Sequence, residues 1–256
     1  VLLGASIGAG SLAAAGPLLL GGIALVVVCA IGASYAVSRL IGLTPHLAIL
    51  VACGNSICGN SAIAATAPVI GAKGDDVAAT IAFTALIGIP MVLLLPLAMP
   101  LLGLNESQYG MLAGLTVYAV PQVLAATAPV SPLALQTGTL VKLVRVMMLG
   151  PVVMALALIA GRKNEQSLRL SAMIPWFVVG FAVMMTLRGL DMIPQPALAP
   201  MITASSLLTA LSMAALGLSV DLRAATSSGG AVIGAALASL CMLGLFSLTL
   251  ISLLPA

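Results

Sequence analysis

Charged residues are scarce in this sequence. They make up only 6% of its 256 residues, whereas hydrophobic residues make up 62%. A soluble domain carries roughly 25% charged residues, because its surface faces water. The charged residues fall in short clusters, separated by charge-free stretches close to the ~20 residues that a helix needs to cross a ~30 Å hydrocarbon core. The composition therefore excludes a soluble protein and predicts an integral membrane protein.

The sequence also lacks the side-chain sets on which enzymes and metal sites depend. It has one histidine, His46, and four cysteines that lie in apolar segments without the paired spacing of a zinc site or a disulfide framework. No Ser/His/Asp set and no phosphate-binding loop is present, and no acid lies inside an apolar segment. We expect no enzymatic activity, cofactor, metal or membrane-embedded carboxylate relay. The net charge of +3 is spread over helix ends, so a nucleic-acid partner is not expected either.

Long apolar segments account for most of the chain. They are rich in Leu and Ala and do not alternate with polar residues, so they predict helices rather than strands. One partial and eight fuller segments are recognisable, at about 1–14, 17–38, 46–71, 77–103, 108–128, 137–160, 170–188, 198–220 and 229–254. We expect an all-α membrane protein, a polytopic helical bundle in which residues 1–256 form a single transmembrane transporter domain.

The two ends of the chain carry information about topology. The sequence opens at Val1 in the middle of a hydrophobic pattern and lacks the basic start of a signal peptide, so we expect it to be truncated or to be ordered only from an internal position. The bias of Lys and Arg toward the polar 161–169 connection places that connection in the cytoplasm. The C-terminus is then expected to be extracytoplasmic.

Two short internal matches suggest a repeat. Leu3-Gly-Ala-Ser6 matches Leu216-Gly-Leu-Ser219, and the predicted topology gives these copies opposite orientations, as an inverted repeat requires. Ala64-Ala-Thr-Ala-Pro-Val69 recurs unchanged at residues 125–130, but there the predicted orientations are the same. Either the second match is chance, or one of its segments re-enters the membrane instead of crossing it.

The stretch Cys53-Gly-Asn-Ser-Ile-Cys-Gly-Asn-Ser61 is unusual within an apolar segment. Glycine lets the backbone leave the helix, and Asn and Ser bond to nearby main-chain groups, so we predict a broken helix here. Asn60 or Ser61 is expected to cap a second half-helix that ends near Pro68. The N–H groups at the start of that half-helix favour an anion. The alternative is a helix-packing face of small residues.

Lys142 and Arg145 are three residues apart and therefore share one helix face. The roughly 16 residues from Arg145 to Ala160 span only about 24 Å, so the helix is expected to begin earlier and to carry Arg145 below the interface. Bases inside a membrane face a cavity or a partner. The alternative is that both side chains reach from the helix end to the lipid headgroups. Gln122 could add a neutral donor nearby.

Three motifs in this order and spacing resemble the YeiH-type sulfate exporter family: Gly54–Ile63, Thr139–Val146 and Ala214–Ser219. The resemblance runs over essentially the whole chain. It implies roughly two further helices upstream, a bacterial inner-membrane location, and a clan-level relation to cation/proton antiporters and bile-acid-type symporters with inverted repeats and crossed broken helices. Family members often have His-Glu where this sequence has Tyr118-Ala119, so a proton coupling that depends on that pair has no counterpart here.

The residues and the resemblance together predict a secondary transporter that exports a small anion such as sulfate, sulfite or a sulfonate. The anion would bind at the broken helix near the membrane midplane. The candidate substrate-binding residues are Asn55, Ser56, Asn60, Ser61, Gln122, Lys142, Arg145 and Ser219. A coupling proton or sodium ion and a homodimer are open as partners beside the lipid bilayer. The alternatives are an anion or small-solute channel and a non-transporting membrane scaffold or sensor.

Overall fold

The structure is a computed structural model, which describes residues 9–159, 176–190, 192–218 and 230–254. Every regular element in these ranges is a helix. In chain order the elements are α1 (Ala9–Leu40), α2 (Pro45–Cys53), the π-helix η2 (Gly54–Cys58), α3 (Asn60–Ile70), α4 (Gly74–Leu94), the 3-10 helix η3 (Leu95–Leu97), α5 (Ala98–Leu102), α6 (Glu106–Thr116), α7 (Val120–Thr127), α8 (Pro132–Met147), α9 (Leu149–Ile159), α11 (Trp176–Gly189), α12 (Gln195–Leu218) and α14 (Gly230–Leu253).

Within the described residues, four helical stretches are long and apolar enough to cross a membrane. They are Gly16–Leu40, Gly74–Leu102, Pro132–Ile159 and Gly230–Leu253. A helix is suited to this role because it satisfies its own backbone N–H and C=O groups, which lipid cannot do. The predicted all-α, polytopic membrane fold is confirmed.

Polar residues between the apolar segments set where helices begin. Thr44, Asn105 and Ser131 are the N-caps of α2, α6 and α8, and each side-chain oxygen accepts a backbone N–H of the first turn. Pro132 then occupies the first turn of α8, where a missing N–H has no cost. The helix that carries Lys142 and Arg145 therefore begins well before Arg145, as predicted, and five residues before the start of the segment expected at about 137–160.

The segment around residue 59 is a broken helix, as predicted. The chain runs from α2 through η2 to Gly59, whose φ of 63° and ψ of −126° end the first half, and α3 then begins. Only glycine adopts this conformation readily. The predicted cap is wrong, because Gly59 is the N-cap of α3 and no side chain bonds there. The half-helix ends near Pro68 as predicted, since α3 continues two residues past it to Ile70.

A second broken helix lies where the sequence predicted one continuous segment at 108–128. α6 ends at Thr116, residues 117–119 are non-helical, and α7 begins at Val120. The repeated hexapeptide occupies equivalent places in the two broken helices. Pro45 and Glu106, the first residues of α2 and α6, are separated by the same number of residues as the two hexapeptides. The other match, residues 3–6 with 216–219, lies partly outside the described residues.

Glycines bring α6 and α8 into close contact. A methyl group added at Gly110 or Gly114 would lie 2.6 Å from a main-chain carbonyl oxygen of α8. Gly138 offers the matching small surface on α8, since a Cβ there would lie 3.0 Å from the carbonyl oxygen of Gly110. Small residues four apart are a common means of packing membrane helices at short range. The approach places the second half of α8 beside both helix breaks.

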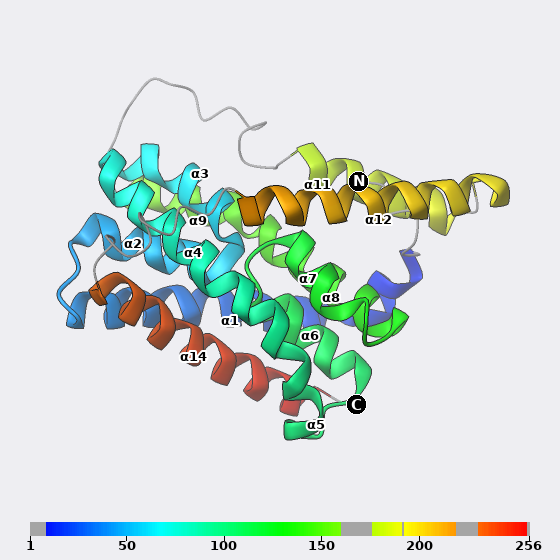
Figure 1. The fold of residues 1–256 in the computed structure, drawn as a ribbon, viewed down its shortest axis with the longest axis horizontal. Coiled ribbons are helices and arrows are strands. Elements are labelled where there is room, and N and C mark those ends of the chain that lie inside the picture. The colour runs from blue at the N-terminus through cyan, green and yellow to red at the C-terminus, as the bar shows by residue number, and fades with distance from the viewer. Residues whose placement is uncertain (1–8, 160–175, 191, 219–229, 255–256) are drawn as a thin grey trace.

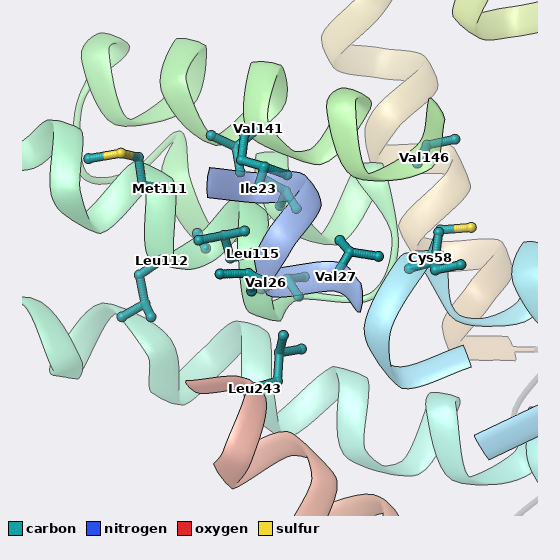
Figure 2. Close-up of a cluster of buried hydrophobic side chains, with 14 of the residues drawn as sticks. Ile23, Val26, Val27, Cys58, Met111, Leu112, Leu115, Val141, Val146 and Leu243 are labelled. Atoms are coloured by element: carbon teal, nitrogen blue, oxygen red, sulfur yellow. The ribbon is translucent and has the colours of Figure 1, made fainter. Parts of the chain in front are cut away.

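The remaining long helices enclose this pair. α12 lies in the upper part of Figure 1 and α14 in the lower part, with α6 and α7 of the second broken helix between them. α14 packs on α1, where the hydroxyl of Ser34 donates to that of Ser239 at 2.9 Å in a buried position. Figure 2 shows the shared core, in which Val26 of α1, Leu115 of α6 and Leu243 of α14 converge.

Replacement of Gly110 by alanine should destabilise the α6–α8 contact. The added methyl group would meet backbone atoms of Ala134, which cannot rotate away. Overpacking of this kind costs about 1–3 kcal/mol, so the thermal unfolding midpoint in detergent should fall. The matched control is Gly244→Ala in α14, where an added Cβ meets nothing within 4 Å. Equal midpoints for the two variants would contradict the packing described here.

Candidate functional site

The two broken helices meet at their breaks. The hydroxyl of Tyr118, in the second break, donates a hydrogen bond of 2.8 Å to Oδ1 of Asn55 in the first. Both residues are buried, with at most 2% of their surface exposed. Residues far apart in the sequence thus form one junction, against which α8 places Lys142 and Arg145.

Lys142 joins the two breaks through main-chain carbonyl groups. Its Nζ donates to the carbonyl oxygen of Ile57 at 2.6 Å and to that of Val117 at 2.9 Å. These carbonyls belong to the first and second break respectively, where a regular helix would have supplied an N–H partner. The lysine side chain is completely buried. It is therefore not reaching for the lipid headgroups, which was the alternative interpretation of this residue.

Arg145 repeats this arrangement with a broader set of donors. Its Nε donates to the carbonyl oxygen of Ser56 and its Nη2 to that of Asn55, both at 3.1 Å. Its Nη1 donates to Gly114 O at 3.0 Å and, less closely, to Val117 O at 3.4 Å. The guanidinium is completely buried. Its fixed fork of donors suits several carbonyls at once, which a single ammonium cannot match.

The junction carries an excess of positive charge. The C-terminal end of a helix is equivalent to about −0.5 of a unit charge, so the ends of the two first half-helices offset about one of the two positive charges when both bases are protonated. All six hydrogen bonds of these two side chains end on uncharged carbonyl groups. The remaining charge favours an anion at this place.

Two buried donors at the junction are unsatisfied. Nδ2 of Asn55 and Oγ of Ser56 receive no hydrogen-bond partner from any part of the chain that the structure describes. Neither side chain has any exposed surface. A buried polar group without a partner costs about 1–3 kcal/mol, so each such group in a folded protein needs an explanation. Ser38 Oγ and Thr66 Oγ1 are also buried without a partner in the described residues. Both atoms can donate to an acceptor on a ligand.

The other predicted site residues lie around this junction or outside the described residues. Asn60 is half-buried, and its Oδ1 accepts a short hydrogen bond from the hydroxyl of Thr84 in α4. Ser61 is exposed. Gln122 is buried at the start of α7, and its Oε1 accepts from the N–H of Ala119 at 3.2 Å. Ser219 lies outside the described residues.

The sequence did not identify Tyr118 as part of the site. It was noted only as a departure from the family pattern, because nothing placed residue 118 at a helix break. One signal could have located that break. Pro121 disfavours a helical conformation at the residue before it and is well suited to the first turn of a new helix. Without the tertiary contact to Asn55, that signal says nothing about function.

Replacement of Arg145 by lysine should destabilise the junction although the charge is kept. One ammonium group cannot bond the carbonyls of Asn55, Ser56 and Gly114 together. We expect a loss of about 3 kcal/mol, measured as a lower thermal unfolding midpoint in detergent. Arg39→Lys is the matched control, since Arg39 makes one bond, to Leu43 O at 2.6 Å, at the end of α1. A similar loss in both variants would argue against the carbonyl contacts.

Comparisons with known proteins agree with the membrane fold. A family profile described as "Conserved hypothetical protein 698" matches residues 1–236. A UPF0324 membrane protein of Agrobacterium fabrum is 57% identical over 255 residues, covering 100% of this chain and 74% of that protein. A UPF0324 membrane protein of Brucella melitensis is 59% identical over 255 residues, covering 99% and 71%. One of Bacillus cereus is 34% identical over 247 residues, covering 94% and 70%.

These relatives are similar to the chain over nearly its whole length, and their names state a membrane location. No solved structure matches the chain. The four apolar helices of spanning length agree with the location that the names state. The chain therefore belongs to the UPF0324 membrane protein family, also described as Conserved hypothetical protein 698, and is an integral membrane protein of bacteria.

Proposed function

We propose that this protein is a secondary transporter of a small oxyanion such as sulfate, sulfite or a sulfonate. The observation that carries the proposal is the pair of unsatisfied buried donors, Asn55 Nδ2 and Ser56 Oγ, at a junction that also holds two buried bases. An anion that accepts from both donors would remove their cost and would balance the remaining positive charge. The same anion would lie close to the start of α3.

The start of α3 adds to the attraction. A helix N-terminus is equivalent to about +0.5 of a unit charge, and its first N–H groups lack partners inside the helix. No side chain caps α3 at Gly59, so the first backbone N–H groups of α3 remain available to the oxygens of a bound anion. Binding sites formed by helix breaks are typical of secondary transporters, in which non-helical backbone lines the substrate path.

The junction would act as the fixed part of an alternating-access mechanism. Lys142 and Arg145 bond to both breaks, and α6 contacts α8 through glycines, so these elements would move as one body. The surrounding helices would slide past this body and would open the anion site first to one side of the membrane and then to the other. The distribution of Lys and Arg supports a plasma-membrane orientation with the C-terminus outside the cytoplasm.

Flux measurements in proteoliposomes test the proposal. Purified protein should take up radiolabelled sulfate or sulfite in a saturable manner, and unlabelled anion on the opposite side should accelerate the uptake. A channel would show neither saturation nor acceleration. A scaffold or sensor would show no flux, and that result would overturn the proposed function.

Replacement of Ser56 by alanine should weaken anion binding. The hydroxyl would donate to a charged acceptor, a hydrogen bond worth about 1.5–3 kcal/mol, so the KM for the transported anion should rise about tenfold or more. Ser38→Ala is a close control, because Ser38 Oγ is also buried without a partner but lies near the end of α1, outside the junction. Equal KM values for the two variants would remove Ser56 from the site.

A further inference from the structure

Tyr118 is held in one position by its neighbours on several sides. Its ring lies edge-on to Phe83 of α4, with centroids 6.3 Å apart and an angle of 77° between the planes. Two glycines leave room for it, since a methyl group at Gly59 would lie 3.2 Å from Tyr118 Cβ and one at Gly88 would lie 3.3 Å from Cδ2. The ring cannot move far, and the direction of its hydroxyl group is therefore set by packing.

The hydroxyl of Tyr118 determines how the amide of Asn55 is oriented. Its O–H donates to Asn55 Oδ1 at 2.8 Å in a buried position. If the amide were turned over, Nδ2 would face the hydroxyl, and the buried O–H would lose its acceptor. An unpaired buried donor is costly, so the orientation with Oδ1 toward Tyr118 is preferred. Nδ2 then points away from Tyr118 and has no hydrogen-bond partner in the described part of the chain.

We propose that Tyr118 is a specificity-determining positioning residue, which keeps Asn55 as a hydrogen-bond donor and so selects oxyanions that carry no proton. The inference rests on the proposed function and deepens it. Sulfate and sulfonates at neutral pH have only acceptor oxygens. Hydrogen phosphate and bicarbonate keep an O–H group that needs an acceptor in the site.

The junction has few acceptors left for such an O–H group. The carbonyl oxygens of Asn55, Ser56 and Ile57 already accept hydrogen bonds from Lys142 or Arg145. The side-chain oxygen of Asn55 accepts from Tyr118. A bound anion with a proton must therefore turn its O–H toward the hydroxyl oxygen of Ser56, which can accept it, and away from Nδ2 of Asn55, so fewer bound orientations keep every hydrogen bond and the site disfavours such a ligand.

Sulfate and phosphate flux into proteoliposomes at neutral pH tests this inference. The wild-type protein should prefer sulfate. In Tyr118→Phe the ring is kept but the amide of Asn55 loses its fixed orientation, so Oδ1 can turn and accept the proton of hydrogen phosphate. The ratio of sulfate to phosphate kcat/KM should fall about tenfold or more.

Tyr109→Phe is the matched control. Tyr109 is also buried, and its hydroxyl donates at 2.8 Å to Ala126 O within the second broken helix, away from Asn55. Each of the two variants loses one buried phenolic oxygen, so a general loss of stability would affect both alike. The control should keep the wild-type ratio. An equal fall in both variants, or an unchanged ratio in Tyr118→Phe with flux retained, would overturn the inference.

A second variant tests the same idea if Tyr118→Phe is not recovered in folded form. Asn55→Asp keeps an acceptor for Tyr118 but replaces the donor by a carboxylate oxygen, so sulfate flux should fall by at least about tenfold. Full sulfate flux in this variant would contradict a donor role for Asn55. Wild-type protein that carries no anion would overturn the proposed function together with this inference, whereas flux without the selectivity change would overturn the inference alone.

Discussion

Main-chain carbonyl groups that lose their helical partners inside a membrane protein need donors from the protein itself, because lipid offers none. Two helices of this chain end and restart at the same place, and the carbonyls released there would otherwise be unpaired. Lys142 and Arg145 supply the donors from one face of α8. The bases have a structural task, which explains why both are fully buried although all their hydrogen bonds in the described residues end on carbonyl groups. When both are protonated, their charge is only partly offset by the helix ends, and the proposed anion site depends on this excess.

The close packing of α8 against α6 also helps to pair the carbonyl groups at the helix breaks. Arg145 reaches Gly114 O at 3.0 Å, and a larger residue at Gly110 or Gly114 would hold the two helices apart. Thus one run of small residues sets the distance, and the carbonyl contacts depend on it. Around this unit, Tyr118 and Asn55 add a side-chain bond between the breaks, and Asn55 and Ser56 leave donors without partners. A rigid frame with unsatisfied donors is the arrangement that a preorganised binding site requires.

Much of the fold followed from local patterns. Charge-free apolar stretches mark the membrane segments because a spanning helix must bury its backbone and expose apolar side chains. The tandem Cys-Gly-Asn-Ser marks the first break because glycine and short polar residues interrupt a helix. The second break was missed, since the residues around Val117 lie in an apolar segment without the tandem glycine and asparagine of the first break, and only Pro121 signals the restart. The cap of α3 was also wrong, because the positive φ at residue 59 required the glycine there rather than a polar side chain.

By itself the sequence determined the membrane class, the positions of most helices, the first break and the candidacy of Lys142 and Arg145, because each of these depends on composition or spacing along one segment. Only the tertiary structure decided what those bases contact, that a second break meets the first, and that Tyr118 donates a hydrogen bond to Asn55. The reason is that the hydrogen bonds from α8 to the breaks depend on how closely α6 and α8 approach. Glycines at 110 and 114 permit a close approach, but their spacing along one segment does not say which helix packs against them.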